Sequence, residues 1–383
     1  MTGMEKKYSE NKKILITTGL FPPQIGGPAT YSELLLRELP KRGFSVRVQN
    51  FGWVLHFPKI IRHIVYFFKV LRHSFWADII YAQDPASVGL PSLVAAKLTG
   101  KPFLLKIVGD YAWEQGAQRS GVEDLLDVFS VENEKYPFLV RVFKRVQKFV
   151  ADRADKVVVP SKYLKHIISN WGVDPSKITV IYNAFHPPHV NDSHEELRRK
   201  YHMTGKILIT VGRLVPWKGF PMLIELMPEI AQTINNVKLF VVGDGPDKEY
   251  LQNVVKKSKT EKFVELSGKK PQKELFEMIK ASDLFVLNTS YEGLSHQLLE
   301  VLALETPIIT TPAGGNVETI DSEINGLLIP YNNKKAWKKS IQDLLNHPEK
   351  RKKLTISGKE KVKEFGEEKM LSEISAILKS IAK

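Results

Sequence analysis

Two glutamates in the stretch YEGLSHQLLE, residues 291–300, have the type and spacing that most directly suggest chemistry. Glu292 and Glu300 enclose seven residues that include no Asp, Glu, Lys or Arg. A helix is expected to begin near Leu294 or Ser295, just after an apolar strand. Glu292 then lies in the strand–helix loop, and Glu300 lies about two turns further on. Eight residues at ~1.5 Å each put the two backbones roughly 12 Å apart.

This spacing is awkward for a glycosidase pair, whose carboxyl groups stand roughly 5 to 9.5 Å apart. It suits the two ends of one extended ligand. One carboxylate can accept hydrogen bonds from both hydroxyls of a ribose, while the other faces the far end of the molecule. A nucleotide-diphosphate sugar has this layout of ribose, two phosphates and sugar, so the spacing predicts a site for such a molecule.

Cations for the two phosphates are expected in the stretch VGRLVPWKGF, residues 211–220. Arg213 and Lys218 follow the first expected strand of the second half, and Gly212 and Gly219 allow tight backbone turns. Arginine grips phosphate oxygens with a planar fork, and lysine adds a mobile point charge. The alternative is a pair of solvated surface cations.

A glycine pair in the first half, Gly26-Gly27, lies in the stretch GLFPPQIGGPATY after the first expected strand. Pro28 suits the first turn of a helix, and a helix N-terminus favours an anion. Bare backbone here would let a ligand phosphate or sugar approach. An ordinary glycine turn remains the alternative. The motif is neither the G-x-G-x-x-G of nicotinamide enzymes nor a phosphate-binding P-loop.

Other loops after strands are less specific. In the second half, GDGP (243–246) is expected to be a structural turn, whereas AGGN (313–316) is either a tight turn or a source of ligand-facing amides. In the first half, VGDYAWE (108–114) sets Asp110 and Glu114 beside aromatic residues, the composition of a sugar-binding wall. We assign Asp110 a catalytic role there, with a helix-capping aspartate over core aromatics as the alternative.

The elements that must position these loops are short apolar runs alternating with helical patterns, which predicts parallel sheets covered on both faces. The fold class expected is α/β, with two doubly wound Rossmann-like domains facing a central cleft and ligands at the carboxyl ends of the strands. The expected domains are 1–188 and 189–366, followed by an amphipathic helix at 367–383. The expected strands are 13–20, 44–51, 78–84, 101–109, 156–161, 178–183, 206–212, 237–245, 262–268, 283–290, 306–312 and 326–330. Helices are expected at 29–43 and 92–100, and a linker at 185–196.

Composition narrows the class of protein. The 383 residues carry a formal net charge of +14 and no cysteine, which excludes a disulfide framework and a cysteine zinc site. Residues 1–190 hold 26 Lys and Arg against 16 Asp and Glu, so most of the excess lies in the first half. A basic half suggests nucleic acid, a phosphate ligand or an anionic membrane surface as partner. The polar start and the lack of a long apolar run predict a cytoplasmic protein.

Two basic and aromatic stretches could meet such a membrane surface. In FPKIIRHIVYFFKVLRHSF, residues 57–75, basic and aromatic side chains recur at helical spacing, and RVFKRVQKF, residues 141–149, is similar. Helices of this kind can lie on anionic lipid. The alternative is a helix packed on the sheet with a hydrated basic face. The first interpretation predicts a peripheral protein on the inner face of the membrane, with a lipid-linked substrate.

Together, GLFPPQIGGPATY, VGRLVPWKG, VVGDGP and EGLSHQLLEVLALETPIITTPAGG resemble family four of the retaining glycosyltransferases, which have the GT-B fold. The resemblance implies that Glu292 faces the donor sugar and Glu300 the ribose, and that Arg213 and Lys218 hold the diphosphate. It also implies that the final helix packs back on the first domain. Many family members carry a histidine where this chain has VGDYAW. The donor-binding set implied is Gly26, Gly27, Arg213, Lys218, Glu292, Gly293, Leu294, Ser295 and Glu300.

The activity expected from this resemblance is metal-independent, cofactor-free transfer of a sugar, with retention, from a nucleotide-diphosphate sugar to a glycan or lipid-linked acceptor. Surface polysaccharide or glycolipid synthesis is the expected context. Arg213 and Lys218 would stabilise charge on the departing diphosphate. The alternatives are an inverting transferase, a nucleotide-sugar epimerase, an inactive scaffold, or a non-catalytic anion-binding protein. Nucleic acid is not an expected partner, because the sequence has no helix-turn-helix, RNP or KH signature.

Overall fold

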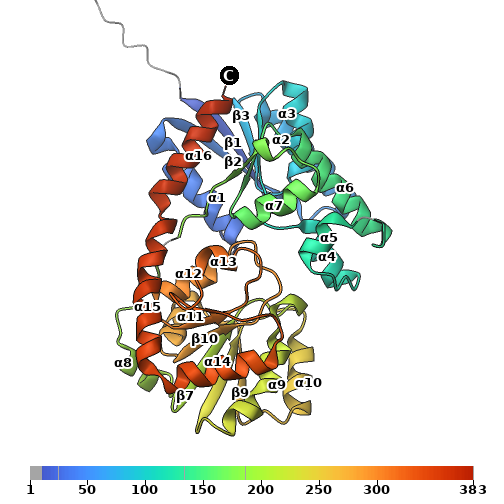
Figure 1. The fold of residues 1–383 in the computed structure, drawn as a ribbon. Coiled ribbons are helices and arrows are strands. Elements are labelled where there is room, and N and C mark those ends of the chain that lie inside the picture. The colour runs from blue at the N-terminus through green and yellow to red at the C-terminus, as the bar shows by residue number, and fades with distance from the viewer. Residues whose placement is uncertain (1–10, 25, 133, 186, 383) are drawn as a thin grey trace, which may run out of the picture.

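The structure is a computed structural model that describes residues 11–382 apart from residues 25, 133 and 186. It has two α/β halves, one above the other, with α15 beside the lower half and the last helix, α16, beside the upper one (Figure 1). Each half contains one six-stranded sheet in which all the strand pairs are parallel. The expected α/β class and the two doubly wound sheets are confirmed.

The first sheet has the strand order β2-β1-β3-β4-β5-β6, so its order reverses between β1 and β3. Its strands are β1 Lys12–Thr18, β2 Phe44–Asn50, β3 Ile79–Ala82, β4 Phe103–Lys106, β5 Lys156–Val159 and β6 Ile178–Val180. The apolar runs form strands because both faces of the sheet are covered: every residue of β3 and β4 is buried.

The second sheet has the order β12-β11-β10-β7-β8-β9, and it reverses between β7 and β10. Its strands are β7 Lys206–Val211, β8 Val237–Val242, β9 Val264–Gly268, β10 Leu284–Leu287, β11 Ile308–Thr310 and β12 Leu327–Leu328. Ligands of such sheets bind beyond the carboxyl ends of the strands at the point of reversal. A ligand site is therefore expected at the loops after β7 and β10.

Helices cover both faces of each sheet (Figure 1). The first half contains α1 Gly27–Glu38, α2 Lys59–Ser74, α3 Gly89–Thr99, α4 Tyr111–Arg119, α5 Leu126–Val131, α6 Phe138–Arg153 and α7 Lys162–Asn170. The rest of the chain contains α8 His194–Lys200, α9 Phe220–Ala231, α10 Lys248–Lys257, α11 Gln272–Lys280, α12 His296–Ala303, α13 Asn316–Thr319, α14 Lys334–Asn346, α15 Pro348–Val362 and α16 Glu367–Ile381. The expected linker is shorter than predicted, because Ser193 and Glu196 form a capping box that starts α8.

The final helix packs back on the first half, as the resemblance implied. Met370, Ile374 and Leu378 of α16 are buried in the same cluster as Ile14 and Ile16 of β1. Along one helix face this spacing presents a continuous apolar stripe to the sheet. The chain therefore crosses between the halves twice, once before α8 and once before α16.

The two halves also touch across the cleft between them. The Trp113 ring lies 4.8 Å from the Tyr291 ring and 5.2 Å from the Trp217 ring, measured between centroids. The Glu318 carboxylate of α13 accepts hydrogen bonds from the main-chain nitrogens of Lys162 (2.9 Å) and Tyr163 (3.0 Å) at the start of α7. An acid at a helix N-terminus is stabilising, so this contact holds the halves together.

The side of the amphipathic helix α2 that packs on the protein differs from the expected one. Tyr66, which helical spacing placed on one side with the basic residues Lys59, Arg62 and Lys69, is fully buried together with Val70. Ile64 and Phe68, expected on another side, are 51% and 60% exposed. The residue pattern gave the helix correctly but not which side packs on the protein. Within the described residues, no helix has the length and apolarity needed to cross a membrane.

Candidate functional site

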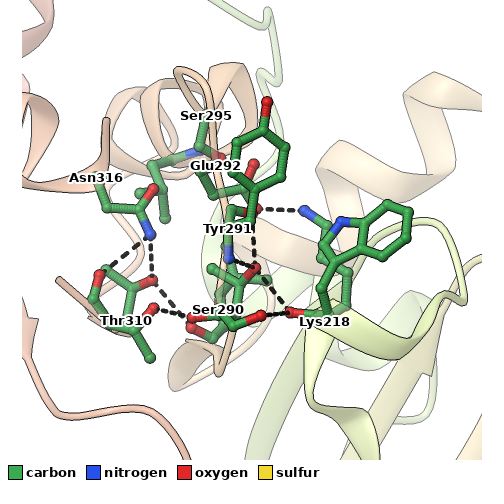
Figure 2. Close-up of polar contacts among 12 residues, drawn as sticks. Lys218, Ser290, Tyr291, Glu292, Ser295, Thr310 and Asn316 are labelled. Atoms are coloured by element: carbon green, nitrogen blue, oxygen red, sulfur yellow. Dashed lines mark hydrogen bonds and ion pairs between the residues drawn. The ribbon is translucent and has the colours of Figure 1, made fainter. Parts of the chain in front are cut away.

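The loops after β7 and β10 come together because these strands are neighbours in the second sheet, with Leu208 paired to Leu284. Lys218 ends the first loop and Glu292 lies in the second. The Lys218 ammonium donates a hydrogen bond to Glu292 Oε1, and the two side chains are only 14% and 13% exposed (Figure 2). The structure thus joins two residues that the sequence analysis selected from stretches 74 residues apart.

The lysine loop is fixed to the end of β10 by main-chain contacts. The Trp217 carbonyl accepts a hydrogen bond from Ser290 N at 2.8 Å and another from Thr289 Oγ1 at 3.1 Å. Gly219 has φ +57°, and a Cβ there would lie 2.1 Å from the Asn288 carbonyl. Only glycine fits this close approach, which sets Lys218 beside Glu292.

The AGGN loop, residues 313–316, packs tightly against the Glu292 loop, as the tight-turn alternative predicts. Gly315 N donates to the Glu292 carbonyl at 2.8 Å, and Gly314, at φ +54°, would place a Cβ 2.0 Å from the same oxygen. The GDGP loop acts similarly: a Cβ on Gly243 would lie 1.9 Å from the Gly212 carbonyl. Both glycine loops therefore support the backbone of the Glu292 and Arg213 loops.

One acid and one cation of the second half, Glu300 and Arg213, remain available to a ligand. The carboxyl group of Glu300, in α12, makes no ion pair or hydrogen bond with any described residue, and burial raises its pKa to about 7. Arg213 is exposed, and it too has no ion-pair partner within the described part of the chain. Ser295 caps α12, its hydroxyl accepting from Leu298 N at 3.4 Å, and Leu294 before it is buried.

The glycine pair of the first half faces the same region. Gly27 begins α1, and a Cβ added to it would meet no atom within 4 Å. Gly27 and Leu294 both line a cavity of about 140 Å³ between the halves. The glycine loop and the Glu292 loop therefore border one cavity, and the bare backbone at Gly27 leaves room there.

The structure corrects the catalytic role predicted for Asp110. Asp110 is fully buried, and its Oδ1 accepts hydrogen bonds from Trp113 N at 2.9 Å and Gln147 Nε2 at 2.8 Å. These are the contacts of an N-terminal cap, which starts α4. The capping alternative is the right one, and Asp110 positions α4 without reaching the cleft.

The acid that faces the cleft from this side is Glu114, one turn into α4. The Arg213 charge acts on it, although burial is the larger effect and raises its pKa to about 7. A Cβ on Gly109 would lie 2.7 Å from Glu114 Oε1 and 3.0 Å from Tyr291 Oη, so these groups meet over bare backbone. Glu114 was expected in a possible sugar-binding wall, but only Asp110 was predicted to be catalytic.

Two further residues were missed. Lys106 at the end of β4 and His296 at the start of α12 line the same cavity as Gly27. Lys106 was read as part of a strand, and His296 as one of the uncharged residues between the glutamates. No sequence signal marked either residue, because they come from different halves of the chain and share a cavity only in the folded protein.

Both halves of the chain match known families. Residues 193–361 match the family described as Glycosyl transferases group 1, and residues 25–187 match Glycosyltransferase Family 4. A glycosyltransferase of Methanocaldococcus jannaschii is 26% identical over 380 residues, which is 97% of this chain and 99% of that protein. The GPI3 subunit of Saccharomyces cerevisiae phosphatidylinositol N-acetylglucosaminyltransferase is 27% identical over 325 residues, or 81% of this chain and 70% of its own length.

Solved structures share the architecture. The Anabaena protein HepE, crystallised with UDP and glucose, superposes with a TM-score of 0.76 at 18% identity, covering 96% of this chain and all of that one. Sucrose-phosphate synthase of Thermosynechococcus elongatus gives 0.77 at 18% identity, with 97% and 99% covered. The two family matches together show that the chain is a glycosyltransferase of family 4, and the likeness to solved structures shows that it has the GT-B fold.

Proposed function

We propose that this glycosyltransferase moves a sugar, with retention and without a metal ion, from a nucleotide-diphosphate sugar to a hydroxyl of a glycan or lipid-linked acceptor. The single observation that carries the proposal is the Lys218–Glu292 contact at the point where the second sheet reverses. It sets a cation and an acid side by side, and on the flanking segments the side chains of Arg213 and Glu300 have no ion-pair partner among the described residues.

The charges of the protein indicate how the donor binds. The diphosphate lies between Arg213 and Lys218, and Lys218 exchanges its bond to Glu292 for one to a phosphate oxygen. Glu292 is then free to accept hydrogen bonds from the sugar, and Glu300 from the ribose hydroxyls. UDP-sugars are the first donors to test, because the Anabaena protein of the same fold was crystallised with UDP.

The same groups explain how the bond breaks. As the sugar–phosphate bond lengthens, negative charge grows on the diphosphate, and two preorganised cations stabilise it. The acceptor oxygen bonds to the anomeric carbon on the face that the phosphate leaves. Its proton passes to a phosphate oxygen, so retention requires no nucleophile from the protein. Contact between the halves, at Trp113 and Tyr291, limits entry of water.

Substitution of the two cations tests the proposal. Arg213→Ala and Lys218→Ala are each expected to lower kcat/KM by about 30- to 1000-fold, or ~2–4 kcal/mol of transition-state stabilisation. Arg199→Ala and Lys256→Ala, at exposed positions of the same half, are the matched controls. Unchanged turnover in both site variants would remove the basis of the assignment. Proton NMR of the product decides between retention and inversion, and an inverted anomer would contradict the mechanism.

Membrane association belongs to the same proposal. Exposed Ile64 and Phe68 lie on α2 with exposed Lys69 and Arg72, the composition of a helix that lies on anionic lipid. We expect co-sedimentation with phosphatidylcholine vesicles only when they contain phosphatidylglycerol, and loss of it in Ile64→Ser/Phe68→Ser. Ile356→Ser, 58% exposed on α15, is the control. Equal binding to both vesicle types would count against a membrane-surface role.

A further inference from the structure

A small cavity between the two halves holds a set of polar groups that the proposed mechanism does not use. Its volume is about 140 Å³, whereas one water molecule needs roughly 15 Å³ by the same kind of measure. It therefore has room for a group of several heavy atoms. Six of its lining residues are Gly27, Tyr31, Gln83, Lys106, Asn183 and His296. We call it the Lys106 cavity.

Lys106 is a buried cation without an acidic partner. It is 1% exposed, and its ammonium donates to Asn183 Oδ1 at 2.7 Å and lies 3.8 Å from the centroid of the Tyr31 ring. No carboxylate forms an ion pair with it among the described residues. Burial alone lowers its pKa to about 7. An ammonium has three donors, so the bond to Asn183 leaves capacity for a ligand.

The neighbouring groups favour negative charge as well. The positive end of the 12-residue helix α1 begins at Gly27. Gln83 is 3% exposed, and its Nε2 has no hydrogen-bond partner in the described structure. Burial and the nearby Lys106 lower the pKa of His296 to about 4, so this ring is a neutral hydrogen-bonding group. The remaining titratable groups are phenols, Tyr31 and its partner Tyr81, at 2.9 Å between hydroxyl oxygens.

A purely structural lysine would not account for this arrangement. The other residues of β4, Phe103, Leu104 and Leu105, are apolar and fully buried, so an apolar side chain would continue the pattern. Burying an unpaired ammonium costs several kcal/mol, and an amide and a phenol ring offset only part of it. A ligand carrying the opposite charge would supply the rest.

We infer that the Lys106 cavity is a subsite for an acidic group, a carboxylate or a phosphate, carried by the transferred sugar or by the acceptor. This rests on the proposed function, because Gly27 and Leu294 place the cavity beside the Glu292 loop where the sugar end of the donor lies. Lys106 then determines specificity: it selects a charged sugar or a phosphorylated acceptor over a neutral one. The diphosphate remains with Arg213 and Lys218.

The experiment compares matched charged and neutral probes on the full-length protein. Affinity is measured by calorimetry for UDP, UDP-glucose and UDP-glucuronate, and, on the UDP complex, for glycerol and glycerol 3-phosphate. We expect one anionic probe to bind at least about tenfold tighter than its neutral counterpart. The donor pair reports a charged sugar, and the glycerol pair reports a phosphorylated acceptor.

Lys106→Met should abolish that preference while leaving the affinity for UDP unchanged, and Lys97→Met, at an exposed position of α3, should alter neither. A variant that weakens UDP itself would place the cavity on the diphosphate and overturn the inference. So would the absence of any preference in the unmodified protein. UDP affinity that still depends on Arg213 and Lys218 would show that the proposed function survives such a failure.

A second readout needs no variant and so does not depend on how Lys106→Met folds. An anion bound beside Lys106 raises the pKa of that ammonium, so binding above pH 7 must take up protons. Titrations in buffers of different ionisation enthalpy measure this uptake. All UDP donors share the proton exchange at Glu300, so a larger uptake for the anionic probe than for its neutral counterpart supports the subsite, whereas equal uptake for both contradicts it.

Discussion

Glu300 offers the sharpest test of whether the site is built for a ligand at the expense of stability. The carboxyl is partly buried without a partner among the described residues, and burial raises its pKa from 4.5 to about 7. The Glu300 carboxyl therefore binds a proton more tightly in the folded protein than in the unfolded chain. The contribution of this carboxyl to the free energy of unfolding is fully present below pH 4.5 and is lost as the pH rises through 7.

The size of the effect follows from the difference between the two pKa values. About 2.5 pH units at 1.36 kcal/mol each correspond to roughly 3 kcal/mol of folding free energy lost above pH 7. Residual contact with water screens the charge, so the measured value should be on the order of 1–3 kcal/mol. Glu300→Gln removes the charge and keeps the shape, and it should therefore be more stable than the unmodified protein at pH 8.

Thermal unfolding at pH 5 and pH 8 measures the difference. At about 2–4 °C per kcal/mol for a domain of this size, Glu300→Gln should raise the midpoint by several degrees at pH 8 and by less at pH 5. The same variant should bind UDP about 10-fold or more weakly, because hydrogen bonds to a charged acceptor are lost. Glu249→Gln, exposed on α10, is the control. A variant that is no more stable at pH 8, or that binds UDP normally, would refute the reasoning.

Two further predictions concern the framework of the site. Gly314→Ala puts a methyl group 2.0 Å from the Glu292 carbonyl at φ +54°; we expect a loss of at least about 1–3 kcal/mol of stability and of most activity, measured by unfolding and turnover. Gly121→Ala, also at positive φ but with no atom near the added methyl, should lower stability by about 1 kcal/mol and leave activity intact. Glu318→Ala removes the acceptor of the Lys162 and Tyr163 main-chain nitrogens and about 1 kcal/mol of contact between the halves, so small-angle scattering should show a larger radius of gyration, and an unchanged radius would exclude a clamping role.

The sequence was sufficient for the sheets and for the half of the site that lies on them. All twelve expected strands are present, because a fully buried parallel strand is a short apolar run that needs no knowledge of its partners. Arg213, Lys218 and Glu292 could be chosen because they follow strands, and the carboxyl ends of parallel strands share one edge. The meeting of Lys218 with Glu292 follows from that rule.

Contacts between segments far apart in the chain could not be predicted from local sequence patterns. Lys106 meets Asn183 from 77 residues away, and a lysine in a sequence is ordinarily read as exposed. Asp110 was given a catalytic role because a carboxylate beside aromatics has the composition of a sugar-binding wall. Only its bond to Gln147, 37 residues on, shows that the aspartate is a buried cap. The faces of α2 were misjudged for the same reason, since periodicity gives two faces without saying which one is covered.

The central claim is that a nucleotide-diphosphate sugar lies across the cleft, with its diphosphate between Arg213 and Lys218 and its ribose on Glu300. The most direct measurement is a crystal structure of the protein with a UDP-sugar that it binds. The account predicts both cations within hydrogen-bond distance of phosphate oxygens and Glu300 accepting from the ribose hydroxyls. A donor bound elsewhere, or Lys218 still paired with Glu292 beside a bound donor, would contradict it.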